Sequence, residues 1–130
     1  MDWTLAQEHA LINEQLTNLD RAIALERVGG DLELLQEVAR LFVDDCPSCM
    51  QSIRAAIDAS DAKALERAAH NLKGAVANFG AKSSVAAALR LEQIGRTGQT
   101  DGAEQAFREL AAALERLTPE LVALADGPGE

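Results

Sequence analysis

The chain has 130 residues, of which 48% are apolar and 25% charged, a balance typical of one globular domain and unlike a disordered chain. Its formal net charge of −9 repels phosphate backbones and anionic bilayers, so neither nucleic acid nor a membrane is the expected partner. Aromatic residues make up only 3%, which favours a core of leucine, alanine, valine and isoleucine and therefore packed helices.

Residues 1–18 are predicted to form a leading helix or a linker. Apolar residues in and just after this segment recur with three-four spacing, at Leu5, Ile12, Leu16 and Leu19. His9 lies on the same stripe. The start, MDWTLAQEH, lacks the basic and apolar regions of a signal peptide, and no apolar run could span a bilayer. A cytoplasmic protein without membrane insertion is therefore expected.

A short helix and a long helix are expected next. Asp20 is a suitable N-cap for RAIALERV, residues 21–28, which Gly29 and Gly30 would end because glycine tolerates a left-handed backbone. Asp31 then caps a long helix whose inward positions are Leu35, Val38, Phe42, Cys46, Cys49, Ile53 and Ala56. Because this spacing keeps its phase across Pro47, a kink is expected there and not a break.

The following helix is capped by Ser60 or Asp61 and closed by Gly80. Its inward positions are Leu65, Ala69, Leu72, Val76 and Phe79. A further helix is expected from Ser83 or Ser84. It turns Val85, Ala88 and Leu89 inward and fades from Gly95 to Gly98.

The last helix has one apolar stripe, with a kink or a restart expected at Pro119. The stripe consists of Ala103, Phe107, Leu110, Leu114, Leu117, Leu121 and Leu124. Residues 126–130 read as a frayed tail. Short connections favour antiparallel neighbours, so the predicted fold is all-α: an up-down-up-down four-helix bundle over residues 19–125, with an additional N-terminal helix or helices.

The stretch AAHNLKGAVANFG, residues 68–80, carries the candidate functional group. If Ala69 and Leu72 face the core, His70 lies at the edge of the buried stripe, within reach of solvent. A neutral imidazole can attack an electrophile while a lysine one turn away, here Lys73, stabilises the resulting negative charge. Gly74 costs about 1 kcal/mol relative to alanine inside a helix. No turn or cap explains this glycine, which favours close approach by another molecule over a plain exposed histidine beside a lysine.

AHNLKGAVANFGA resembles the signature of the histidine phosphotransfer (HPt) domain family. In that signature the histidine is followed by x-(Leu/Ile)-Lys-Gly and, ten residues after the histidine, by a second glycine. The matching residues are His70, Leu72, Lys73, Gly74 and Gly80. The resemblance extends over about residues 19–125 and implies a four-helix bundle that relays phosphoryl groups between receiver domains of two-component systems.

The resemblance also implies roles for the residues around the histidine. His70 would accept the phosphoryl group on Nε2, and Lys73 would screen the phosphate. Gly74 would leave room for the receiver, with Ala77 and Glu66 on the same docking face. Gly29, Gly30 and Gly80 would be structural.

Glu92 stands 22 residues after the histidine, where family members often carry glutamine or glutamate bonded to the other ring nitrogen. A carboxylate that accepts from Nδ1–H would orient the ring with Nε2 free. The alternative is a solvated carboxylate beside Arg90 or Arg96. Gln93 is the neighbouring candidate if the helix phase is off by one.

The implied partners are receiver domains of response regulators, a hybrid sensor histidine kinase, or both, and Mg²⁺ is expected on the partner receiver. The chain itself has no Walker-type loop and no dense carboxylate cluster for a metal. We therefore expect no intrinsic cofactor, no metal and no ATP-dependent kinase activity. The protein would be a carrier that its partners phosphorylate and discharge.

Two other functions compete with this interpretation. CPSC, residues 46–49, has the spacing of a thiol redox motif, but it lies inside a predicted helix without the preceding strand that such motifs have. Buried cysteine also behaves as a small apolar residue. The second alternative is a helical protein-interaction module that keeps the fold without being phosphorylated.

Overall fold

The computed structural model describes residues 19–127, which form five α-helices and, within that range, no strands. The helices are α2 (Arg21–Arg27), α3 (Leu32–Asp58), α4 (Ala62–Ala77), α5 (Lys82–Arg96) and α6 (Ala103–Asp126). The predicted leading helix over residues 1–18 lies outside the described residues, as do residues 128–130 of the predicted tail.

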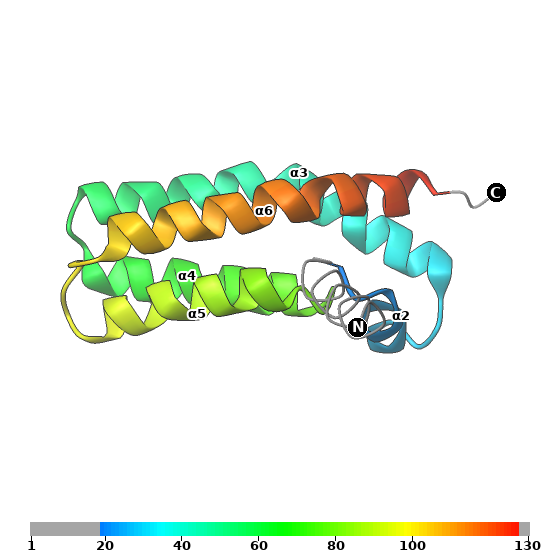
Figure 1. Ribbon diagram of the computed structural model, residues 1–130, viewed down its shortest axis with the longest axis horizontal. Helices are drawn as coiled ribbons and strands as arrows, with labels where there is room; N and C mark the ends of the chain where they lie inside the picture. Colours follow the sequence, from blue (N-terminus) through cyan, green and yellow to red (C-terminus); the bar gives the residue numbers. More distant parts are fainter. Residues whose placement is uncertain (1–18, 128–130) are drawn as a thin grey trace, which may run out of the picture.

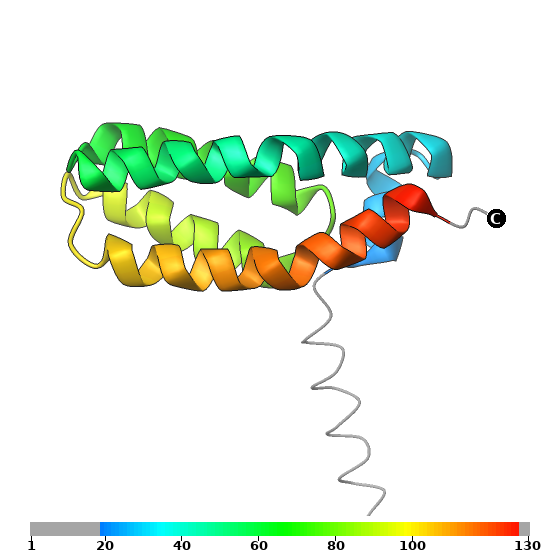
Figure 2. The same cartoon turned by 90° about the horizontal axis from the view of Figure 1, so that it is seen from above.

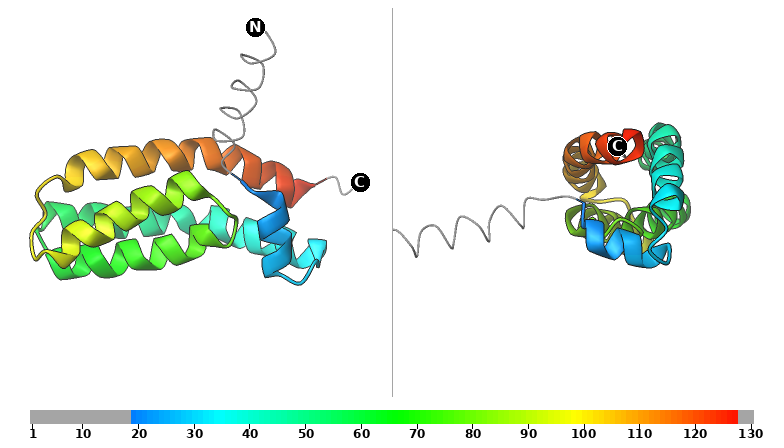
Figure 3. Two further views of the ribbon diagram at one scale, coloured as in Figure 1. Left: turned by 60° about the horizontal axis from the view of Figure 1, so that its bottom comes forward. Right: turned by 90° about the vertical axis from the view of Figure 1, so that its right-hand side faces the viewer.

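The four long helices form an antiparallel bundle, with α2 across one end (Figure 1). Seen end-on, they stand at the corners of a square, and each long helix packs against two neighbours: α4 against α3 and α5, and α6 against α5 and α3 (Figure 3). The buried core consists almost wholly of leucine, alanine, valine, isoleucine and phenylalanine side chains. The predicted all-α, up-down-up-down four-helix bundle is confirmed.

Aspartate side chains begin three of the helices. Asp20, Asp31 and Asp61 each accept a hydrogen bond from the backbone N–H three residues later, at 3.2, 3.1 and 3.1 Å. Each cap satisfies one of the N–H groups that the first helical turn leaves unpaired. The predicted caps of α2 and α3 are confirmed, and Asp61, not Ser60, caps α4.

Pro47 and Pro119 both lie inside helices that continue past them. The helix α3 is unbroken through Pro47, as expected. The helix α6 changes direction toward its C-terminal end without ending there, so a restart at Pro119 is wrong (Figure 2). Tertiary packing therefore outweighs the cost of a proline inside each of these helices.

The end of α4 differs from the prediction. The helix stops at Ala77, so Phe79 is no longer helical, yet its side chain is fully buried and its ring lies 5.6 Å from that of Phe42. Gly80 follows with a φ of +60°, and a Cβ added there would lie 2.6 Å from Asp20 Cβ. Gly80 is therefore needed both for the turn and for the close approach of the chain that enters α2.

The helix α5 begins at Lys82, before the predicted Ser83 or Ser84, and its N-cap Ala81 makes no side-chain capping bond. Ser84 is instead buried. The buried face of α5 is also rotated about the helix axis relative to the predicted face. Leu91 and Glu92 are buried, whereas Leu89 is only half-buried. Four other residues predicted to point inward are half-buried at the edge of the core: Val38, Cys49, Val85 and Phe107.

Candidate functional site

His70 lies in α4 on an open face of the bundle. Its side chain is 63% exposed, while the neighbouring Ala69 and Leu72 are completely buried and anchor the helix. Gly74 lies one turn further along the same face, and a Cβ added there would meet nothing within 4 Å. The imidazole and the glycine therefore share a surface that no other described part of the chain covers.

Glu92 on α5 reaches this surface from beneath. Its side chain is only 3% exposed, and its Oε2 lies 3.0 Å from His70 Nδ1. Its Oε1 forms an ion pair with Lys73 Nζ at 2.7 Å. The alternative of a solvated carboxylate is therefore wrong for Glu92, and the neighbouring Gln93 is exposed to solvent.

The charges around Glu92 keep it ionised despite its burial. The Lys73 ammonium, and then His70, hold the pKa of Glu92 below its usual range, against burial, which alone would raise that pKa. A carboxylate whose pKa is lowered in this way carries its full negative charge at neutral pH. It can then only accept hydrogen bonds.

This charge state decides how the proton on His70 is placed. Since Glu92 has no proton to donate, the 3.0 Å contact requires Nδ1–H of His70 as the donor. In the neutral ring the lone pair then resides on Nε2. Within residues 19–127 this second ring nitrogen has no hydrogen-bond partner, so a nucleophilic nitrogen is left on the exposed side of the ring.

Gly95 explains how Glu92 comes so close to α4. A Cβ added at Gly95 would lie 2.6 Å from the backbone nitrogen of Glu66 and 2.7 Å from the carbonyl oxygen of Ala62. The two helices therefore touch backbone to backbone here. From the sequence, Gly95 is expected at the fading end of a helix. Its position four residues after the buried Leu91 is the signal that could have identified it as a packing glycine.

Arg96 and Glu66 complete the cluster. Arg96 Nη2 donates to Glu92 Oε2 at 2.8 Å, and Arg96 Nε donates to Glu66 Oε2 at 3.2 Å. One continuous network, which we call the His70 cluster, thus joins five residues: His70, Lys73, Glu92, Glu66 and Arg96. From the sequence, Arg96 is expected only as one of two arginines beside a solvated Glu92 carboxylate.

The remaining predicted residues lie outside the His70 cluster. Ala77 is half-buried at the end of α4, two turns beyond His70, and makes no polar contact with the His70 cluster. Gly29 and Gly30 form the turn between α2 and α3 with φ values of 68° and 82°, and Gly30 N–H donates to Leu25 O at 2.8 Å. Together with Gly80, these two glycines shape turns and not the candidate site.

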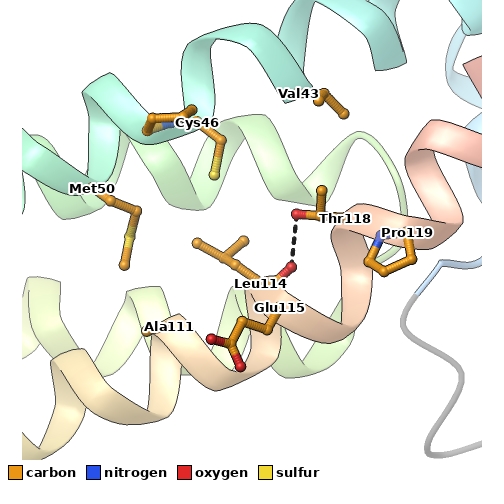
Figure 4. A pocket seen from close by; sticks show the side chains of 9 residues that line it. Val43, Cys46, Met50, Ala111, Leu114, Glu115, Thr118 and Pro119 are labelled. Carbon is orange, nitrogen blue, oxygen red and sulfur yellow. Dashed lines mark hydrogen bonds between the residues drawn. The ribbon is translucent and has the colours of Figure 1, made fainter.

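The two cysteines lie on α3, and Cys46 is on the side of this helix that faces α6. Cys46 lines an apolar groove of about 480 Å³ together with Met50, Leu114 and Pro119 (Figure 4). Both thiols are free, and burial raises the pKa of Cys46 and the pKa of Cys49. A raised pKa keeps a thiol protonated and therefore a poor nucleophile. The structure thus gives no support to the thiol redox alternative.

The part of the chain that the structure describes contains no group of three or more His, Cys, Asp or Glu side chains placed to hold a metal ion. None of its helices has the length and apolar character needed to cross a membrane.

Comparisons with known proteins agree with this fold. The family model described as "Hpt domain" matches residues 37–119. Among solved structures, the chain is similar to the HPt domain of an Hpt sensor hybrid histidine kinase from Shewanella. The TM-score is 0.74 at 18% identity, and the match covers 85% of this chain and 96% of that one. No curated protein sequence matches the chain.

The chain belongs to the Hpt domain family, since the family model spans more than half of it. Membership supports a phosphorelay carrier role in two-component signalling. Hpt domains are phosphotransfer carriers and not kinases, and their partners are receiver domains and histidine kinases. The structural likeness to the Shewanella domain supports the same fold.

Proposed function

We propose that His70 is the phosphoacceptor, which takes a phosphoryl group from an aspartate of one receiver domain and passes it to another. One observation carries this proposal: an exposed imidazole whose Nδ1 contacts a buried, ionised carboxylate at 3.0 Å. That contact favours the tautomer in which Nε2 is the nucleophile.

The transfer step balances without loss of a proton. The Nε2 lone pair attacks phosphorus, an N–P bond forms, and the O–P bond to the receiver aspartate breaks, so that the carboxylate leaves with the electron pair. The ring keeps its Nδ1 proton and gains positive charge. Glu92 Oε2, 3.0 Å from Nδ1, stabilises that charge, so positioning and electrostatics supply most of the catalysis. Transfer to the second receiver is the same step in reverse.

Lys73 is proposed to screen the phosphoryl oxygens. Its side chain is 27% exposed, and it lies on α4 three residues after His70, on the same helical face. Gly74 is proposed to leave room for the loops of the docked receiver, because the space beside its Cα is open. Glu66 and Ala77 are proposed to border the same docking face.

The bundle is proposed to need no cofactor of its own. Mg²⁺ is expected on the partner receiver, whose aspartate carries the activated phosphoryl group. The partners are expected to be response regulators, a hybrid sensor histidine kinase, or both, and the chain would act as a carrier without ATP-dependent kinase activity.

The proposal is tested by incubating the protein with a phosphorylated receiver and following the label. Phosphohistidine is labile in acid and stable in alkali, so wild type should gain a label with these properties and His70→Gln should gain none. If wild type stays unlabelled while it still binds the receiver, the chain is the helical interaction module considered as the alternative. Equal labelling of His70→Gln would also overturn the assignment.

The docking face has its own test. Gly74→Leu adds bulk where a receiver would approach, so transfer at low receiver concentration should slow. Ala112→Leu places the same leucine side chain at an exposed position on α6, which does not pack against α4, and should leave transfer unchanged. Equal transfer rates in the two variants would place the docking face elsewhere.

A further inference from the structure

Arg96 holds two carboxylates at once, although its side chain is 60% exposed. Its Nη2 donates at 2.8 Å to Glu92 Oε2, the same oxygen that lies 3.0 Å from His70 Nδ1. Its Nε donates at 3.2 Å to Glu66 Oε2, one helical turn before His70 on α4. The guanidinium thus bridges α5 to α4 directly beside the imidazole.

Among the residues of the His70 cluster, Glu92 depends most on compensation of its charge by neighbouring cations. It is 2% exposed, and removing the partner of a buried charge is strongly destabilising, because the charge is then left without compensation. When the ring is neutral, two carboxylates and two cations balance: Glu92 and Glu66 against Lys73 and Arg96.

A phosphoryl group on His70 disturbs this balance. It brings further negative charge onto the face of α4 that also carries Lys73. If Lys73 turns to the phosphoryl oxygens, Glu92 Oε1 loses the ammonium that now lies 2.7 Å away. Arg96 does not need to move, because Glu66 holds its Nε while its Nη2 stays on Glu92.

We propose that Arg96 is a positioning residue: the second counter-ion of Glu92, which keeps this carboxylate charged and in place when Lys73 pairs with the phosphoryl group. The second half of this inference, the role of Arg96 once Lys73 pairs with the phosphoryl group, rests on the proposed role of His70. Its first half, the shared pairing of Glu92 by Lys73 and Arg96, concerns the unphosphorylated protein alone.

The first half is tested by urea unfolding of the full chain. Lys73→Gln and Arg96→Gln should each lower the urea midpoint slightly, because the other cation still pairs Glu92. The double variant should lower it by more than the sum of the two shifts, and this excess should vanish in a Glu92→Gln background. Additive shifts, or an excess that persists without the Glu92 charge, would overturn the shared pairing.

The second half is tested by transfer from a phosphorylated receiver over a range of receiver concentrations. Arg96→Gln should lower the maximal rate by about tenfold, as loss of a residue that orients a reacting group does. Arg96→Lys should restore most of that rate, because it returns the charge. Arg90→Gln is the matched control, since this arginine of α5 pairs with Glu109, outside the His70 cluster.

Three outcomes contradict the positioning role. One is a rise in the half-saturating receiver concentration at an unchanged maximal rate, which would mean that Arg96 contacts the receiver. Another is an equal loss of rate in the Glu92→Gln background, and the third is no loss at all. A wild type that takes no label overturns the proposed function instead, and urea unfolding then still decides whether Arg96 shares Glu92 with Lys73.

Discussion

Glu92 Oε2 lies 3.0 Å from His70 Nδ1, and the carboxylate is almost completely buried while the imidazole is largely exposed. Through this pairing, the packing of the helices determines the chemistry of the exposed ring. The helix α5 buries the carboxylate against α4, and the carboxylate in turn fixes which nitrogen of the exposed ring carries the proton.

The buried carboxylate makes stability depend on pH in a defined direction. The pKa of Glu92 is lowered in the folded state, so its ionised form favours folding. This stabilisation is complete above the ordinary carboxyl pKa of 4.5 and is lost as the pH falls through the lowered value. We expect the free energy of unfolding of wild type, minus that of Glu92→Gln, to decrease as the pH falls below 4.5. Urea unfolding of both proteins at several pH values measures this difference in unfolding free energy. A difference that does not change with pH would contradict the ionised, paired state of Glu92.

Two glycines inside helices should respond oppositely to alanine. Gly95→Ala places a Cβ 2.6 Å from the backbone nitrogen of Glu66, which forces α5 away from α4 and should cost about 1–3 kcal/mol of unfolding free energy. Gly74→Ala meets open space and should stabilise the helix by about 1 kcal/mol. Chemical denaturation of the two variants beside wild type is the measurement. A Gly95→Ala variant as stable as wild type or more stable would mean that the helix contact at Gly95 is not as close as described.

Ser84→Ala distinguishes a capping serine from a buried one. A serine that caps α5 would cost about 1 kcal/mol when replaced by alanine. In the structure Ser84 is 1% exposed, and its Oγ has no hydrogen-bond partner among residues 19–127. Removing an unpaired buried hydroxyl should leave stability unchanged or raise it by up to about 1 kcal/mol. A clear loss of stability, with Ser83→Ala as the comparison, would restore the capping role.

Replacing both cysteines by alanine should leave phosphotransfer to His70 unchanged. Cys46 lies on the α3–α6 side of the bundle. The raised pKa values of both thiols make them weak nucleophiles. In native protein near neutral pH, Cys46 should also react with iodoacetamide much more slowly than in urea. Loss of transfer in the Cys46→Ala/Cys49→Ala variant, with the fold intact, would reopen the thiol alternative.

The bundle could be predicted from the sequence because its signals are local. Asp20 and Asp31 mark helix starts through their own side chains, and the three-four spacing on both sides of Pro47 reveals a continuous buried face. The exposure of His70 followed from the same periodicity, since Ala69 and Leu72 fix the orientation of α4.

The features that escaped prediction depend on what another helix places opposite. Gly95 is a packing residue only because the backbone of α4 passes 2.6 Å from where its Cβ would be. Arg96 joins the His70 cluster only because α4 places Glu66 beside it. Phe79 is buried although the helix has ended, because Phe42 of α3 lies beside it. The periodicity of a single helix does not show what lies opposite it, although the spacing of Gly95 four residues after Leu91 places this glycine on the buried face.

The most direct test of the central claim locates the phosphoryl group by NMR. The ¹⁵N-labelled protein is phosphorylated by a receiver, and ³¹P, ¹⁵N and ¹H correlations of the His70 ring are recorded. We expect phosphorus bonded to Nε2 while Nδ1 keeps its proton. Phosphorus on Nδ1, or on any residue other than His70, would contradict it.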